Sequence, residues 1–136
     1  MNNVESFNLI VGLAFADLYE NFPDPIDLEP LTYVQKAGLS FDPRDVNRKE
    51  GGHAESAIRW LLDEGFIRGV SPKYSGSGVQ RAVLTFMGLR LLSIPDSMQP
   101  QELIGAGLSK AARAGAREWV ADLVKEAFFE GSKFAS

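Results

Sequence analysis

The fold is decided by the stretch Ile58-Arg59-Trp60-Leu61-Leu62-Asp63-Glu64-Gly65-Phe66-Ile67. Apolar residues recur through residues 54–62 at three- and four-residue steps, which predicts a helix with one buried face that begins at His53. Gly65 can adopt the left-handed conformation that ends a helix, and Phe66 and Ile67 suit the start of a strand. The sequence therefore predicts a helix, a turn at Gly65 and a strand over residues 66–71.

A second β-rich run, residues 79–85, follows across a segment rich in Gly and Ser. Two such runs joined by a short loop predict a β-hairpin. The second run leads into Leu84-Thr85-Phe86, where the Thr85 side chain can cap a helix over residues 86–92 that ends before Pro95.

The N-terminal third of the chain predicts two more helices and a strand stub. Asn3 can cap a helix whose apolar stripe consists of Phe7, Ile10, Val11, Ala14, Leu18 and Phe22. Pro23 and Pro25 end this helix, and residues 26–28 alternate as a short strand. Pro30 suits the first turn of a helix over residues 31–37, which Gly38 can close. Residues 40–52 are polar and predict a loop.

The order helix, strand stub, helix, helix, hairpin, helix resembles the winged-helix branch of the helix-turn-helix proteins. The resemblance is carried by residues 58–67 and by Ala82-Val83-Leu84-Thr85-Phe86-Met87-Gly88-Leu89-Arg90-Leu91-Leu92. It implies a mainly α, α+β fold: a winged-helix domain over residues 1–95 with a small hairpin wing. Many winged helices bind DNA through the third helix and the wing, whereas others serve only to dock proteins.

Residues 96–136 are predicted to be a C-terminal helical arm, with a helix over 101–129 that Gly105, Gly107 and Gly115 weaken. Its apolar face needs a partner, because a winged-helix core is complete without it. The candidate oligomer interface comprises Leu108, Ala112, Ala116, Trp119, Val120, Leu123, Ala127 and Phe128. Three alternatives remain open: a second copy in a homodimer, which we favour; the first helix of the same chain; and a membrane surface, which the mixed charges of the polar face disfavour. Deleting residues 97–136 is then expected to convert a dimer into a monomer.

Charge and residue spacing disfavour ordinary reading of DNA bases by the third helix. The chain has a net charge of −4, and residues 1–30 carry six acids and no Lys or Arg. The outer face of the third helix presents Glu55, Arg59 and Asp63 at four-residue steps, so these side chains can pair with each other. Contacts with phosphates remain open, and the candidate DNA-binding residues are Arg44, Arg48, Lys49, Arg59, Lys73, Tyr74 and Arg81.

No motif in the chain predicts an enzyme, a metal site or a cofactor. There is no Cys and only one His, His53, so the usual zinc ligand sets cannot form. Gly76-Ser77-Gly78 is not a nucleophile elbow, and Gly105-Ala106-Gly107 lacks the remaining residues of a phosphate loop. We therefore expect a non-enzymatic regulator of bacterial or phage type with weak or accessory DNA binding. The alternative is a protein-interaction module without DNA binding.

The expected cellular location of the protein depends on two features that the sequence lacks, a secretion signal and a membrane span. The apolar run 7–16 has no basic residue before it, so it does not predict a secretion signal. No run of about 18 apolar residues predicts a membrane span. We expect a cytoplasmic protein.

Overall fold

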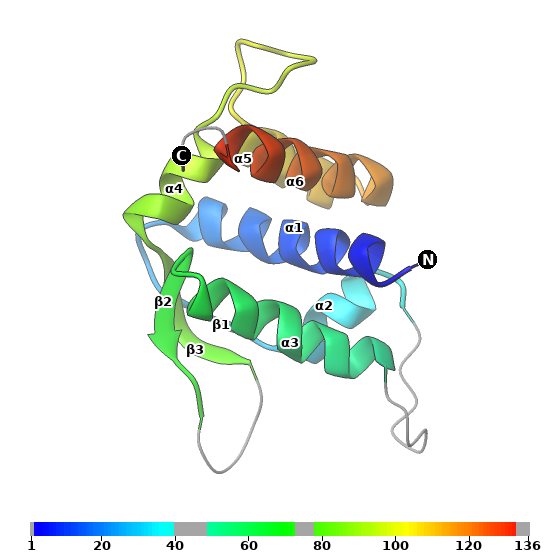
Figure 1. Cartoon of the computed structure of the whole chain (residues 1–136), viewed down its shortest axis with the longest axis vertical. Helices are drawn as coiled ribbons and strands as arrows, with labels where there is room; N and C mark the ends of the chain where they lie inside the picture. The colour runs from blue at the N-terminus through cyan, green and yellow to red at the C-terminus, as the bar shows by residue number, and fades with distance from the viewer. Residues whose placement is uncertain (1, 40–48, 73–77, 133–136) are drawn as a thin grey trace.

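The computed structural model describes residues 2–39, 49–72 and 78–132, which form a mixed α and β fold (Figure 1). The helices within these ranges are α1 (Asn3–Asn21), α2 (Pro30–Lys36), α3 (Lys49–Asp63), α4 (Phe86–Leu92), α5 (Ile104–Arg113) and α6 (Arg117–Ser132). The strands are β1 (Ile26–Leu28), β2 (Ile67–Val70) and β3 (Val79–Leu84).

Helix α1 lies in the middle of the molecule, with α5 and α6 on one side and α2 and α3 on the other (Figure 1). Every residue from Asn8 to Ala16 is buried. A helix that is apolar on all sides is stable only when its surroundings cover it completely. The sequence predicted a single buried stripe for this helix. The buried surface is wider than that, because Leu9, Leu13 and Phe15 are buried as well.

The three strands form one antiparallel sheet in the order β1-β3-β2. The predicted hairpin is confirmed, with Ile67 opposite Leu84, and the predicted strand stub pairs with its far side through Ile26 and Ala82. Arg81 interrupts the regular pairing with a positive φ of 54°, and its backbone N–H donates to Asp27 Oδ1 at 2.9 Å.

The predicted turn at Gly65 and the predicted cap at Thr85 are both confirmed, and they meet in space. Gly65 has a φ of 82°, which an L side chain rarely adopts, so the chain can turn directly from α3 into β2. The Thr85 hydroxyl donates to the Gly65 carbonyl at 2.6 Å and accepts from the Gly88 N–H at 3.1 Å. One side chain therefore joins the end of α3, the end of β3 and the start of α4.

Three predicted boundaries are wrong. The side chain that caps α1 belongs to Asn2, which accepts from the Glu5 N–H at 2.9 Å, and not to Asn3. Helix α3 begins at Lys49, four residues earlier than predicted, although two glycines follow. The arm is two helices instead of one, because the chain turns at Gly115, which has a φ of 67°.

The arm packs closely against α1 at Gly12. A Cβ at this position would lie 2.5 Å from Val120 Cγ1 and 2.7 Å from Val124 Cγ2 of α6. These distances are well below van der Waals contact, so the absence of a side chain lets α1 and α6 approach each other. The apolar face of the arm is thus covered by α1 of the same chain, which is the second of the three alternatives that the sequence left open.

Candidate functional site

The outward face of α3 is engaged by contacts within the chain. Glu55 accepts from Arg59 Nε at 3.2 Å and, through its other oxygen, from the backbone N–H of Gly78 at 2.7 Å. The predicted pairing along this helix is confirmed for Glu55 and Arg59. Glu55 also ties α3 to the start of β3, so Arg59 and the hairpin are joined through one carboxylate.

Most of the other candidate DNA-binding residues lie outside the described residues. Arg44, Arg48, Lys73 and Tyr74 fall in ranges that the structure does not describe. Lys49 is the first residue of α3, and Arg81 is exposed on β3. Of the seven, only Lys49, Arg59 and Arg81 lie within the described helices and strands, two on α3 and one on β3.

The predicted oligomer interface is an interface within the chain. Four of its residues are almost completely buried, namely Leu108, Val120, Leu123 and Ala127, and the other four, Ala112, Ala116, Trp119 and Phe128, are partly buried against the same core. A second copy could reach the four buried side chains only after α5 and α6 had separated from α1. In this structure these side chains hold the arm on its own core, and their assignment to contacts between copies stays a prediction.

An aromatic cluster joins the arm to the core. The Phe128 ring on α6 lies 5.7 Å from Trp60 of α3 and 5.6 Å from Phe66. Its centroid also lies 6.2 Å from Phe15 of α1, and Phe7 of α1 meets Trp60 edge-on at 5.1 Å. These separations are within the favourable range for aromatic pairs, so Phe128 contacts α1, α3 and the turn between α3 and β2.

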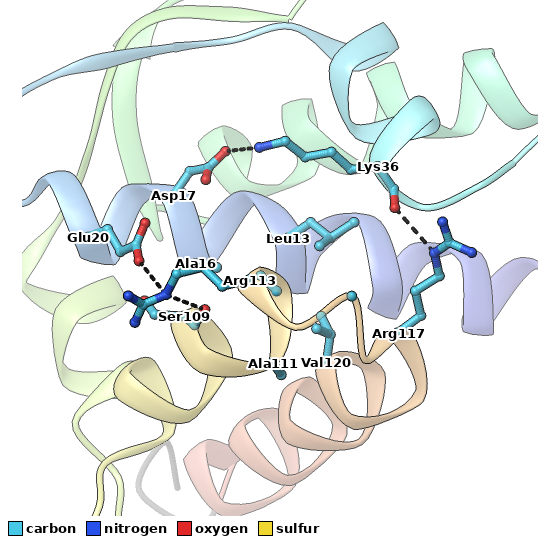
Figure 2. Close-up of a pocket in the computed structure, with 12 residues that line it drawn as sticks. Leu13, Ala16, Asp17, Glu20, Lys36, Ser109, Ala111, Arg113, Arg117 and Val120 are labelled. Atoms are coloured by element: carbon cyan, nitrogen blue, oxygen red, sulfur yellow. Dashed lines mark hydrogen bonds and ion pairs between the residues drawn. The ribbon is translucent and has the colours of Figure 1, made fainter.

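A cleft of about 350 Å³ opens where the turn between α5 and α6 faces α1 and α2 (Figure 2). Apolar residues of α1, α5 and α6 form part of its wall, including Leu13, Ala16 and Val120. Figure 2 shows charged side chains around this wall from several elements: Asp17, Glu20, Lys36, Arg113 and Arg117. Five charged side chains therefore line this cleft.

The two acids of the cleft are paired within the chain. Asp17 Oδ2 accepts from the Tyr33 hydroxyl at 2.7 Å and from Lys36 Nζ at 3.1 Å. Glu20 lies 3.4 Å from Arg113 Nε. Burial, and then the neighbouring Asp17 carboxylate, raise the pKa of Tyr33 far above its ordinary value of 10, so its hydroxyl remains protonated and donates to Asp17.

The third cation of the cleft, Arg117, has a different environment. Its Nε donates to the Lys36 carbonyl at the end of α2 at 3.3 Å. In the part of the chain that the structure describes, no carboxylate lies within ion-pair distance of it. Ser109 lies beside Arg113, whose Nε donates to its carbonyl at 3.3 Å; the Ser109 side chain is 5% exposed, and its hydroxyl has no hydrogen-bond partner among the described residues.

A larger, mostly apolar groove of about 820 Å³ lies between α4 and the end of α6. Its lining includes Phe66, Met87, Leu91, Ile94 and Phe128. At one side of the groove, the segment between α4 and α5 is joined to α6, because the Ser97 N–H donates to Glu126 Oε1 at 2.6 Å.

Sequence reasoning missed both cavities. A single arm helix does not predict a turn between Arg113 and Arg117, and therefore does not predict a cleft beside that turn. The groove residues Met87 and Leu91 follow the helical spacing that was assigned to α4, but no sequence signal indicates that α6 ends beside them.

No protein-family model, no curated protein and no solved structure matches this chain. Within the described ranges, no group of three His, Asp or Glu side chains is arranged to hold a metal ion. Nor does any described helix have the length and apolar character needed to cross a membrane.

Proposed function

We propose that this chain is a non-enzymatic protein-interaction module built on a winged-helix scaffold. The order of elements from α1 to α4 supports the scaffold, as does a sheet in which β1 pairs with the second strand of the hairpin. The turn at Gly65 and the Thr85 cap, whose residues carried the resemblance, support the scaffold as well.

The observation that carries this proposal is the contrast between two surfaces. On α3, Glu55 accepts hydrogen bonds from Arg59 and from the Gly78 N–H. Arg59, the central basic residue of this face, therefore already has a carboxylate partner within the chain. Reading DNA would require Arg59 to exchange this pair for a phosphate or a base edge. The groove between α4 and α6, by contrast, is open and largely apolar.

The occupant that fits the groove is a second copy of this chain. Phe86 and Phe129 are next in sequence to the lining residues Met87 and Phe128, and they are 82% and 65% exposed. A buried phenylalanine contributes on the order of 200 Å², so these two rings supply about 300 Å² per copy and about 600 Å² for a pair. That is half of the roughly 1,200 Å² that a small specific interface buries, before the groove walls are included. The exposed rings and the groove both belong to α4 and α6. In a twofold dimer the rings of each copy could therefore enter the groove of the other.

Sedimentation velocity of the full chain up to about 100 μM tests this contact, because dimers with a micromolar Kd are well populated there. We expect twice the mass of one chain. Met87→Glu places a charge in the groove wall and is expected to give a single-chain mass. Val4→Glu, at an exposed apolar residue on α1, is the matched control and should leave the dimer intact. A single-chain mass for the unmodified protein would overturn self-association, and a dimer that Met87→Glu does not disturb would show that the groove is not its interface.

DNA binding is the second candidate function, and one observation favours it. Lys49 begins α3, the helix that winged-helix proteins place in the major groove, and two further bases, at positions 44 and 48, precede it in the sequence. If these residues bind phosphates, a mixed-sequence duplex will bind at about 50 mM salt and lose most of its affinity by about 200 mM. Fluorescence anisotropy measures this directly. No binding at the lower salt concentration would remove DNA as a partner.

A further inference from the structure

The segment between α4 and α5, residues 93–103, forms a loop that projects beyond the helices (Figure 1). Its outer part, residues 97–101, is exposed at every position. Among the large apolar side chains of the described chain, Met98 in this loop has the highest exposed fraction, 85%. One exposed apolar side chain is common on protein surfaces, and Met98 differs because its loop has a fixed shape and lies beside the groove between α4 and α6.

Backbone and side-chain hydrogen bonds hold this loop. Pro95 and Leu103 pair as an antiparallel β-bridge at its base. Asp96 is almost completely buried; its N–H donates to the Glu102 carbonyl at 2.9 Å, and its Oδ1 accepts from the Met98 N–H at 2.9 Å. The backbone at Met98 is therefore held in place before any partner binds, which lowers the entropy cost of a contact made by its side chain.

The loop borders the groove between α4 and α6. Pro95 and Ser97 belong to the groove lining, and Met98 is the next residue along the chain. A second copy that covers the groove up to this edge would also contact Met98. The exposed residues 97–101 are Ser, Met, Gln, Pro and Gln, so this part of the loop carries no charge. The centres of protein interfaces are likewise poor in charge and rich in Met.

We propose that Met98 anchors the contact between two copies of this chain, an inference that rests on the self-association proposed above. The rings of Phe86 and Phe129 account for about half of the roughly 1,200 Å² that a small specific interface buries, so residues around the groove must supply the rest. Met98 is the most exposed apolar residue next to that groove. In a twofold dimer, the loop of each copy packs its Met98 side chain against the other copy at the edge of the groove.

The first test follows the methionine methyl groups of the full-length protein by NMR, with ¹³C-methyl methionine incorporated. The protein concentration is raised from about 5 μM to about 500 μM, a range that spans a micromolar Kd. We expect the Met98 methyl signal to shift along the same binding curve as the signal of Met87, which lines the groove. In Met87→Glu, which is expected to have a single-chain mass, the Met98 signal should not change with concentration.

The second test measures the dimer Kd of loop variants by sedimentation. Met98→Glu is expected to raise the Kd about 100-fold, about tenfold for each copy, because a twofold contact is made twice. Met98→Leu keeps an apolar side chain of similar size and should change the Kd by less than about threefold. Val4→Glu adds the same charge at an exposed apolar residue of α1 and is the matched control, with the Kd of the unmodified protein.

The outcomes separate this inference from the self-association on which it rests. A Met87 signal that shifts with concentration beside a constant Met98 signal would overturn the role of Met98 and leave the groove contact standing. An unchanged Kd in Met98→Glu, or equal weakening in Met98→Leu and Met98→Glu, would also overturn it. A single-chain mass for the unmodified protein would overturn both proposals. If Met98→Glu does not fold, the methyl signals of the unmodified protein decide.

Discussion

A chain shortened to residues 1–96 is expected to lose its folded structure instead of remaining as a smaller stable domain. The arm buries five large apolar side chains, namely Ile104, Leu108, Val120, Leu123 and Val124. At about 2 kcal/mol each, their burial contributes about 10 kcal/mol, which equals the whole stability of a typical domain. The truncation also exposes the side of α1 that α5 and α6 cover.

Far-UV circular dichroism and thermal melting measure this result, with the loss of a cooperative transition as the expected outcome. The control is the folded full-length chain cleaved at an engineered protease site beside Met98, a residue that is 85% exposed in the loop before α5. The cleaved chain keeps its arm in place and should remain folded. A cooperative melt of residues 1–96 alone would contradict the prediction and would restore the division at residue 95 that the sequence predicts.

Phe128→Ala is expected to lower the free energy of unfolding by about 3 kcal/mol, the lower end of the range for removing a packed aromatic ring. The ring contacts Trp60, Phe66 and Phe15, so its loss removes contacts that α6 makes with both α1 and α3. The melting temperature should fall by about 10 °C, and Trp60 fluorescence should report a changed environment.

Phe129→Ala is the matched control for this variant, since it removes the same side chain from the next residue of the same helix. Phe129 is 65% exposed, so the expected loss is below about 1 kcal/mol. Both variants are compared at low protein concentration, where self-association does not contribute. Equal losses in the two variants would mean that Phe128 does not connect the arm to the core.

The sequence predicted those parts of the fold that depend on neighbouring residues. Gly65 and Thr85 act through contacts within a few positions of a helix end, and both were predicted correctly. The central place of α1 was missed because one stripe was chosen from a segment in which residues 8–16 are buried on every side. The break at Gly115 was identified as a weak point of the arm helix but not as a turn, since single glycines also occur within helices.

The cavities could not be predicted in this way because their residues are distant in sequence and ordinary in type. Arg117 reaches the Lys36 carbonyl across 81 positions, and Lys36 reaches Asp17 across 19. No spacing rule connects such residues, and each one alone suits an exposed helix position. Only the packing of the arm on α1 brings them together.

The central position of α1 has a consequence for how the protein is made. Helix α1 is synthesised first, but α6, which covers one of its sides, begins about 100 residues later. At about 5–20 residues per second, the ribosome needs about 5–20 s to deliver that partner. During this interval the side of α1 that α5 and α6 cover in the folded protein is exposed to solvent. The yield of native protein in the cell therefore depends on protecting α1 from aggregation until translation ends.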